Sequence, residues 1–221
     1  NISREMLQNN PVVTKIRSSL VKRTISDLRK KLNSDKTDYT NFWNSFGPVL
    51  KEGIYEDVER KESLLEIALF KQSASSELIT LDEYISNMQK KQKDIYFITG
   101  DNYESIINNP SLEGYKSRNI NVLILDDPVD SFWTSSTPSY KENNFKSVTQ
   151  GIDDLDKLGK KTEEDIKEKS VDSLLVFLKE KLKEKVKDVR VSKRLTDSPV
   201  CLVSDEGAMD PHLEKICLLY T

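Results

Sequence analysis

The chain has 221 residues, of which 32% are charged and 36% hydrophobic, and its formal net charge is −3. This length is enough for one large domain or two small ones. The weakly negative charge gives no general attraction to nucleic acid or to an anionic membrane, and no apolar run approaches the length of a membrane-spanning helix. Nucleic acid and membrane are therefore not expected as partners.

The first third of the chain predicts packed helices. Pro11 suits the first position of a helix, and the apolar residues after it keep an approximate helical period as far as Leu32. Residues 33–37 are typical of a turn. An aromatic stripe follows, and its helical spacing predicts core packing rather than a ligand platform. The stripe consists of Tyr39, Phe42, Trp43 and Phe46.

Glycine and proline then interrupt this pattern. We expect Gly47-Pro48 and Gly53 to act as breaks between helices. Apolar residues at 64, 65, 68 and 69 predict another short helix after them. Residues 11–72 are therefore predicted to form a compact helical segment.

Residues 78–150 predict a small α/β unit. Thr80–Glu83 reads Thr-Leu-Asp-Glu, a capping box that starts a helix. The short apolar runs 95–98 and 122–125 suit buried strands, and a helical stretch broken at Pro110 connects them. A connection of this length implies a parallel pair with a right-handed crossover, and residues 145–148 are a candidate further strand.

The end of the chain predicts a second, partial domain. A connector rich in Asp, Lys and Glu over residues 149–169 indicates a boundary. After it we expect a long amphipathic helix over 166–186, strands at 187–192 and 200–203, and a helix opened by Asp210-Pro211. The predicted fold class is α/β (α+β overall): a helical segment, a small three-layer α/β/α unit with a short, mainly parallel sheet, and a partial α+β domain whose core we expect to be incomplete.

Few residues of this chain suggest metal or redox chemistry. Cys201 and Cys217 lie in apolar surroundings, which predicts small buried thiols rather than a disulfide framework. The single histidine, His212, leaves too few soft ligands for a zinc site and is expected at the surface. We predict no metal site.

No catalytic constellation can be recognised. Asp126-Asp127 ends the second apolar run, and ligands of α/β sheets often bind at that end of a strand. However, no glycine-rich phosphate-binding loop follows either run. The chain by itself is therefore expected to catalyse no reaction and to bind no cofactor.

Four segments resemble one known family, in its order and at its spacing. The chain is similar over nearly its whole length to the bacterial members of the ninety-kilodalton heat-shock chaperone family, and the likeness thins between residues 135 and 170 and at the extreme C-terminus. The segments are NISREMLQ (1–8), KEGIYED (51–57), DIYFITG (94–100) and RLTDSP (194–199).

The resemblance implies an ATP-driven, homodimeric, cytoplasmic clamp that takes part in the heat-shock stress response and binds unfolded or partly folded client proteins. ATP with Mg would be bound by an N-terminal ATPase domain, which we expect to precede Asn1. Arg4 matches the arginine that this family lends to the ATP γ-phosphate, and Gln8 matches its glutamine partner. By this likeness residues 1–150 are the C-terminal part of the middle domain, with the catalytic loop at 1–10, and residues 151–221 are a connector and the truncated start of the C-terminal dimerisation domain.

The resemblance also implies a client-binding surface, and two questions about it stay open. Either aromatic residue of the pair after the second strand could be the exposed one, and the apolar face of the last helix could equally be core. The candidate residues are Phe132, Trp133, Met209, Leu213 and Ile216. The alternative functions are a nucleotide-independent α/β protein-interaction module and a nucleotide-binding enzyme domain, which the missing phosphate loop disfavours.

Overall fold

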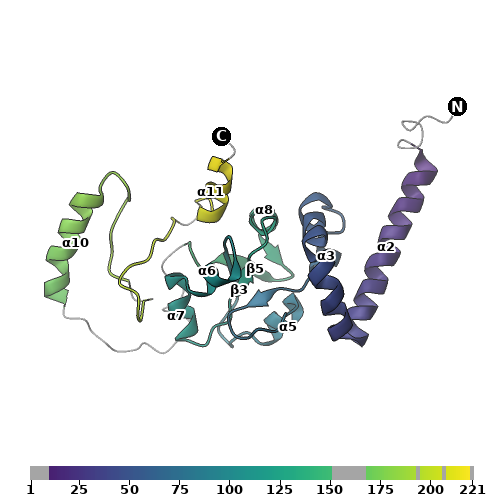
Figure 1. The fold of residues 1–221 in the computed structure, drawn as a ribbon, viewed down its shortest axis with the longest axis horizontal. Coiled ribbons are helices and arrows are strands. Elements are labelled where there is room, and N and C mark those ends of the chain that lie inside the picture. The colour runs from purple at the N-terminus through teal and green to yellow at the C-terminus, as the bar shows by residue number, and fades with distance from the viewer. Residues whose placement is uncertain (1–9, 151–167, 193–194, 206–207, 220–221) are drawn as a thin grey trace.

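The computed structural model describes residues 10–150, 168–192, 195–205 and 208–219. Arg4, Gln8 and most of the charged connector lie outside the described residues. Figure 1 shows a long helical arm at one end, a sheet flanked by helices in the middle, and helix α10 at the other end. In the described part of the chain, no helix is both long and apolar enough to cross a membrane.

Two long helices form the arm, as the sequence predicts. Helix α2 (Pro11–Ser34) begins where the Asn10 side chain accepts a hydrogen bond from Val12 N at 2.9 Å. Helix α3 (Lys36–Glu56) begins in the same way, with Asp35 accepting from Asp38 N at 3.0 Å. Each cap satisfies a backbone N–H that has no partner within its helix, so the predicted turn between the helices is confirmed.

The predicted breaks at Gly47-Pro48 and Gly53 are wrong, because α3 runs through all three residues. Gly47 serves packing: a Cβ at this position would lie 2.8 Å from Cε2 of Trp43. The glycine thus makes room for a buried indole. Pro48 removes one helical hydrogen bond, but the buried face of α3 holds the helix in place.

A short helix and an edge strand follow the arm. Helix α4 (Lys61–Leu65) is shorter than the helix expected from the apolar residues at 64, 65, 68 and 69. Ala68 and Leu69 lie beyond its end and are buried there. Strand β1 (Lys71–Gln72) leads to helix α5 (Leu81–Ser86). The predicted capping box of α5 is confirmed, with Glu83 N donating to Thr80 Oγ1 at 3.1 Å and Thr80 N donating to Glu83 Oε2 at 2.8 Å.

The sheet has five strands in the order β1-β3-β2-β5-β4. The central pairs β3–β2 and β2–β5 are parallel, and the edge pairs are antiparallel. The parallel pair predicted from the two apolar runs and the candidate third strand are therefore confirmed. The remaining strands are β2 (Ile95–Thr99), β3 (Leu123–Leu125), β4 (Ser139–Tyr140) and β5 (Asn143–Ser147).

Helices cover both faces of this sheet, which makes the three predicted layers. Successive side chains of a strand point to opposite faces, and β2 follows this rule. Ile95 and Phe97 join the cluster under α3, α5 and α8 (Asp130–Ser136). Tyr96 and Ile98 join the cluster under the crossover, which has the predicted break at Pro110. The crossover consists of α6 (Tyr103–Ile107), the 3-10 helix η1 (Pro110–Leu112) and α7 (Glu113–Lys116).

The C-terminal part forms two of the predicted helices and neither predicted strand. The helices are α10 (Glu168–Leu182) and α11 (Pro211–Leu219). Residues 187–192 and 200–203 form no strand, although Ser204, just after the second range, forms an isolated bridge with Gln150. A strand needs a partner for its backbone groups and a face to bury. Val191, Val200 and Leu202 are all exposed in the described structure, so these runs lack a buried face.

Candidate functional site

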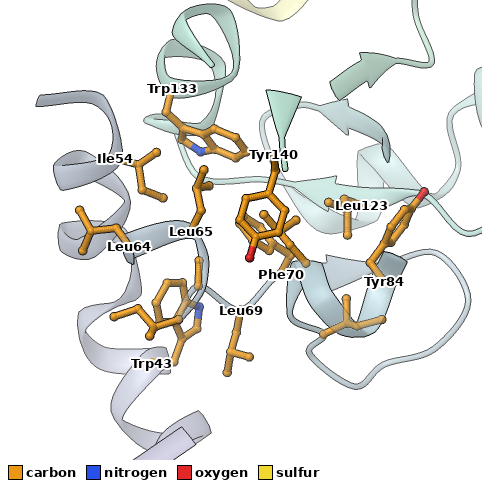
Figure 2. Close-up of a cluster of buried hydrophobic side chains, with 14 of the residues drawn as sticks. Trp43, Ile54, Leu64, Leu65, Leu69, Phe70, Tyr84, Leu123, Trp133 and Tyr140 are labelled. Carbon is orange, nitrogen blue, oxygen red and sulfur yellow. The ribbon is translucent and has the colours of Figure 1, made fainter. Parts of the chain in front are cut away.

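Helix α8 separates the two aromatic residues that the sequence left undecided. Trp133 is fully buried, and its ring lies 5.8 Å from Phe70 and 5.4 Å from Phe145. Figure 2 shows the Trp133 side chain pointing into the core, in the same cluster of buried side chains as Phe70 and Tyr140. Phe132 is 36% exposed and contacts Tyr55, with 6.1 Å between the ring centroids. Trp133 as an exposed client contact is therefore wrong, and Phe132 is the surface aromatic residue of this pair.

A buried ion cluster sets the orientation of α8. Lys51 of α3 is only 4% exposed, and its Nζ donates to Asp127 Oδ2 at 2.7 Å and to Asp130 Oδ2 at 2.9 Å. The other oxygen of Asp130 accepts from Trp133 Nε1 at 2.7 Å. Burial lowers the pKa of Lys51, but Asp130 and Asp127 outweigh it, so that pKa lies above its ordinary value. The cluster joins α3 to the first turn of α8. In the resulting orientation of α8, the Trp133 side chain faces the core and the Phe132 side chain faces solvent.

Helix α11 lies beside α8 (Figure 1) and is anchored by polar groups. Asp210 precedes its first turn and accepts from His212 N at 3.0 Å, which confirms the predicted N-cap. The same carboxylate accepts from Thr99 Oγ1 at 2.7 Å and from Ser147 Oγ at 3.2 Å. One side chain thus caps α11 and attaches it to the carboxyl ends of β2 and β5.

His212 connects α11 to two further segments. Its Nδ1 and the hydroxyl of Ser131 share a hydrogen bond of 2.9 Å, and its Nε2 lies 3.2 Å from Asp101 Oδ1. The side chain is 11% exposed, so the expected surface position is wrong. Lys215 Nζ donates to the other oxygen of Asp101 at 2.5 Å. These two hydrogen bonds, led by the one from Lys215, lower the pKa of the Asp101 carboxyl.

A serine, a histidine and an aspartate in a chain also occur in hydrolases. Here Ser131 is 1% exposed, on the inner side of α8, so its hydroxyl is out of reach of a substrate. We interpret the chain Ser131–His212–Asp101 as a structural connection between α8, α11 and the loop after β2.

Glu113 anchors the segment before α11. Its carboxylate accepts from Thr196 N at 2.8 Å, from Asp197 N at 3.0 Å and from both the backbone and the hydroxyl of Ser198. The Ser198 hydroxyl, with the backbone N–H groups, lowers the pKa of Glu113 to about 2. An ionised carboxylate on α7 therefore holds residues 196–198 beside this helix.

The exposed apolar groups of α8 and α11 form the candidate functional surface. Met209 is 53% exposed, while Leu213 and Ile216 are partly buried. Leu213 and Ile216 lie on α11 and Phe132 lies on α8, two helices in contact, while Met209 lies just before α11. Cys217 on the same helix is exposed and Cys201 is partly buried, so the prediction of two buried thiols is wrong. Apolar groups exposed on neighbouring elements are candidates for a protein-binding site.

Other candidate sites lose support in the described structure. Asp126 and Asp127 follow β3 as predicted, but they pair with Lys71 at 2.6 Å and with Lys51 at 2.7 Å rather than facing an open ligand site. In the ranges that the structure describes, no three His, Cys, Asp or Glu side chains are grouped to hold a metal ion. The carboxylates of this region thus serve packing.

Sequence reasoning missed the residues that place the surface: Ser131, Asp101, Glu113 and the buried Lys51. A signal existed only for Lys51, which lies in one of the family-like segments. The others are ordinary polar residues whose partners lie 81 to 85 residues away, or 111 for the Asp101–His212 contact. Neither periodicity nor local motifs can detect such partners.

Comparison with known proteins identifies the family. A family model described as Hsp90 protein matches residues 1–219. The chain belongs to the Hsp90 family. This agrees with the resemblance found in the four sequence segments, and the matched range includes Arg4, Phe132 and α11.

Several similar proteins are bacterial chaperones named HtpG. The chain is 47% identical to chaperone protein HtpG of Wolbachia pipientis wMel over 97% of its length, and 46% identical to HtpG of Paramagnetospirillum magneticum over 98%. It spans 35% and 36% of those two proteins, about a third of their length. Among solved structures it resembles the middle domain of a heat shock protein of Plasmodium falciparum, with a TM-score of 0.58 and 33% identity, covering 63% of this chain and 60% of that one.

Proposed function

We propose that this chain is the part of an ATP-driven, homodimeric Hsp90-type chaperone that contributes both an arginine loop and a client-binding surface. Residues 1–150 would be the C-terminal part of the middle domain, and residues 151–221 a connector and the start of the dimerisation domain. The whole protein would work in the cytoplasm, and its ATP and Mg would be bound by another domain. The family membership supports this role.

The observation that carries the client-binding part is the display of Phe132. A buried ion cluster and a buried Trp133 hold α8 so that the Phe132 ring reaches solvent, and the exposed Met209 lies just before α11, the helix that contacts α8. Exposing an aromatic side chain on α8 and a thioether side chain just before α11 does not help the fold. A flexible methionine beside an aromatic ring suits binding of varied apolar segments. Unfolded proteins expose such segments.

The test is client binding by the full-length protein. We expect Phe132→Ser and Met209→Ser each to weaken binding of an unfolded client by roughly 5- to 30-fold, because each removes about 1–2 kcal/mol of apolar contact. The melting temperature should change little, since both side chains face solvent. Fluorescence anisotropy with a labelled unfolded client gives the dissociation constant, and calorimetry gives the melting temperature.

Phe46 provides the matched control. It is exposed on α3 and contacts Phe42, 5.2 Å away, instead of α8. Phe46→Ser should leave client binding unchanged. Equal affinity in all three variants would show that α8 and α11 do not bind clients. That result would favour the alternative, a nucleotide-independent interaction module that uses another face.

The arginine loop has its own test. In the full-length protein, Arg4→Ala should leave ATP affinity nearly unchanged and slow ATP turnover, because an arginine that acts from another domain stabilises charge mainly in the transition state. Removing an arginine finger costs about 10³-fold or more in phosphoryl-transfer enzymes. We expect a smaller loss here because the arginine must dock from a separate domain.

A coupled ATPase assay measures turnover and calorimetric titration measures ATP affinity. Arg17→Ala, which removes an exposed arginine of α2, is the control. Turnover that stays the same in Arg4→Ala would take Arg4 out of the catalytic site.

A further inference from the structure

A hydrogen bond between Ser131 of α8 and His212 of α11 joins the two helices of the proposed client-binding surface, next to its apolar residues. Ser131 directly precedes Phe132 on α8, and His212 directly precedes Leu213 on α11. The 2.9 Å hydrogen bond between the Ser131 hydroxyl and His212 Nδ1 therefore links residues adjacent to surface residues on both sides. A change in this contact would move one half of the surface against the other.

Polar contacts, rather than an apolar core, hold α11 in place. Leu213 and Ile216 are only partly buried, and Met209 and Leu218 are exposed. The nearby anchors are Asp210 on Thr99, His212 on Ser131, and Asp101 on both His212 and Lys215. Apolar packing tolerates small sliding movements, whereas hydrogen bonds require defined distances and angles. The position of α11 is thus set by these polar groups.

Among these anchors, His212 alone reaches α8. Asp210 and Lys215 attach α11 to β2, β5 and the loop after β2. They fix the start of the helix but do not define its distance from Phe132. His212 is 11% exposed, so water competes little for its bond to the buried Ser131 hydroxyl.

We propose that His212 is the positioning residue of the client-binding surface: through Ser131 it holds α11 at a defined distance from α8, so that Phe132, Met209 and Leu213 act as one patch. This inference rests on the proposed function for the binding of clients. The positioning itself concerns the distance between two helices and can be measured without any client.

Two substitutions separate the two bonds of His212. The side-chain amide of asparagine can occupy the place of Nδ1, and the longer side chain of glutamine can occupy the place of Nε2. His212→Asn thus keeps a partner for Ser131, whereas His212→Gln keeps the contact with Asp101. If the bond to α8 is what matters, His212→Asn should behave like the unchanged protein and His212→Gln like His212→Ala.

The distance is measured by pulsed electron paramagnetic resonance on the full-length protein with two spin labels. One label sits on Cys217 of α11, which is exposed, and the other on Ser135→Cys of α8, also exposed. Cys201→Ser, and replacement of any cysteine outside these residues, removes other labelling sites. We expect one narrow distance distribution for the parent and for His212→Asn, and a broad one for His212→Ala and His212→Gln. Lys215→Ala, which loses only the contact with Asp101, should stay narrow.

Client affinity is measured on the same variants without labels. We expect His212→Ala and His212→Gln to weaken binding on the order of 3- to 10-fold, as for the loss of one hydrogen bond, and His212→Asn to bind like the parent. In a double-mutant cycle, adding Ser131→Ala to His212→Ala should weaken binding no further. Additive losses, or a narrow distance distribution in His212→Ala, would overturn the proposal.

The outcomes also distinguish this proposal from the function on which it rests. If Phe132→Ser and Met209→Ser leave client affinity unchanged, the proposed function fails, yet the distance distributions still decide whether His212 positions α11. If those two variants lose affinity while every His212 variant keeps it, the function stands and the positioning role is overturned.

Discussion

Lys51→Met is expected to lower the melting temperature of the protein by roughly 6–20 °C. Removing one partner of a buried ion pair costs about 3–5 kcal/mol, because the other charge stays buried without compensation, and each kcal/mol corresponds to about 2–4 °C in a domain of this size. Here Asp130, which is completely buried, would keep its Trp133 contact but lose the ammonium group. Differential scanning calorimetry measures the effect.

Two further variants test whether the loss of stability comes from the unpaired buried charge of Asp130. Lys51→Met combined with Asp130→Asn should recover much of the loss, because the neutral amide still accepts from Trp133 Nε1 and carries no buried charge. Lys61→Met is the control: Lys61 donates to Ser136 O of α8 at 3.1 Å, but this hydrogen bond is exposed and involves no buried charge. Its effect should stay within about 0.5 kcal/mol. A small effect of Lys51→Met would mean that the cluster is not what orients α8.

Trp133→Ala and Phe132→Ala, one residue apart, are expected to differ strongly. Trp133→Ala should destabilise the protein by about 3–5 kcal/mol, because it empties the space between Phe70 and Phe145 in the core. Phe132→Ala should cost about 1 kcal/mol or less, as it loses only part of a surface contact with Tyr55. Denaturant unfolding of the two variants measures both values.

Client binding then separates the roles of the two residues. Phe132→Ala should bind an unfolded client more weakly without a matching loss of stability, whereas any loss of binding in Trp133→Ala should accompany its destabilisation. The reverse pattern, with Phe132→Ala destabilised and Trp133→Ala stable, would mean that the core and surface assignments of α8 are exchanged.

Local signals in the sequence determined most of the helical and sheet architecture. Capping residues such as Asn10, Asp35 and Thr80 start their helices through contacts two or three residues away, so a short window contains all the information. Apolar runs of strand length identified β2 and β3, and the length of their connection implied that they pair in parallel. The family, too, could be recognised from the residues alone.

The same local rules failed where a distant partner decides the structure. Gly47-Pro48 is typical of a break, but Gly47 is needed for the indole of Trp43, and a buried face outweighs one lost hydrogen bond. In residues 187–192, polar and apolar residues alternate as in a strand. However, a strand is stabilised by pairing with a second strand, and the alternation says nothing about that second strand. In the described structure this stretch forms no strand, and Val191 is exposed, so the alternating pattern has no buried face.

For the candidate site, the sequence by itself determined which residue types were present, and only the tertiary structure decided which of them face solvent. Phe132 and Trp133 are neighbours with the same kind of side chain, and it is Lys51, about 80 residues earlier in the chain, that holds Asp130 and with it the rotation of α8. His212 looks like a surface residue until Ser131 and Asp101 are placed beside it. The physical reason is the same in both cases: a helix can turn any of its faces to the core, and the contacts that choose among them come from elements far away in the sequence.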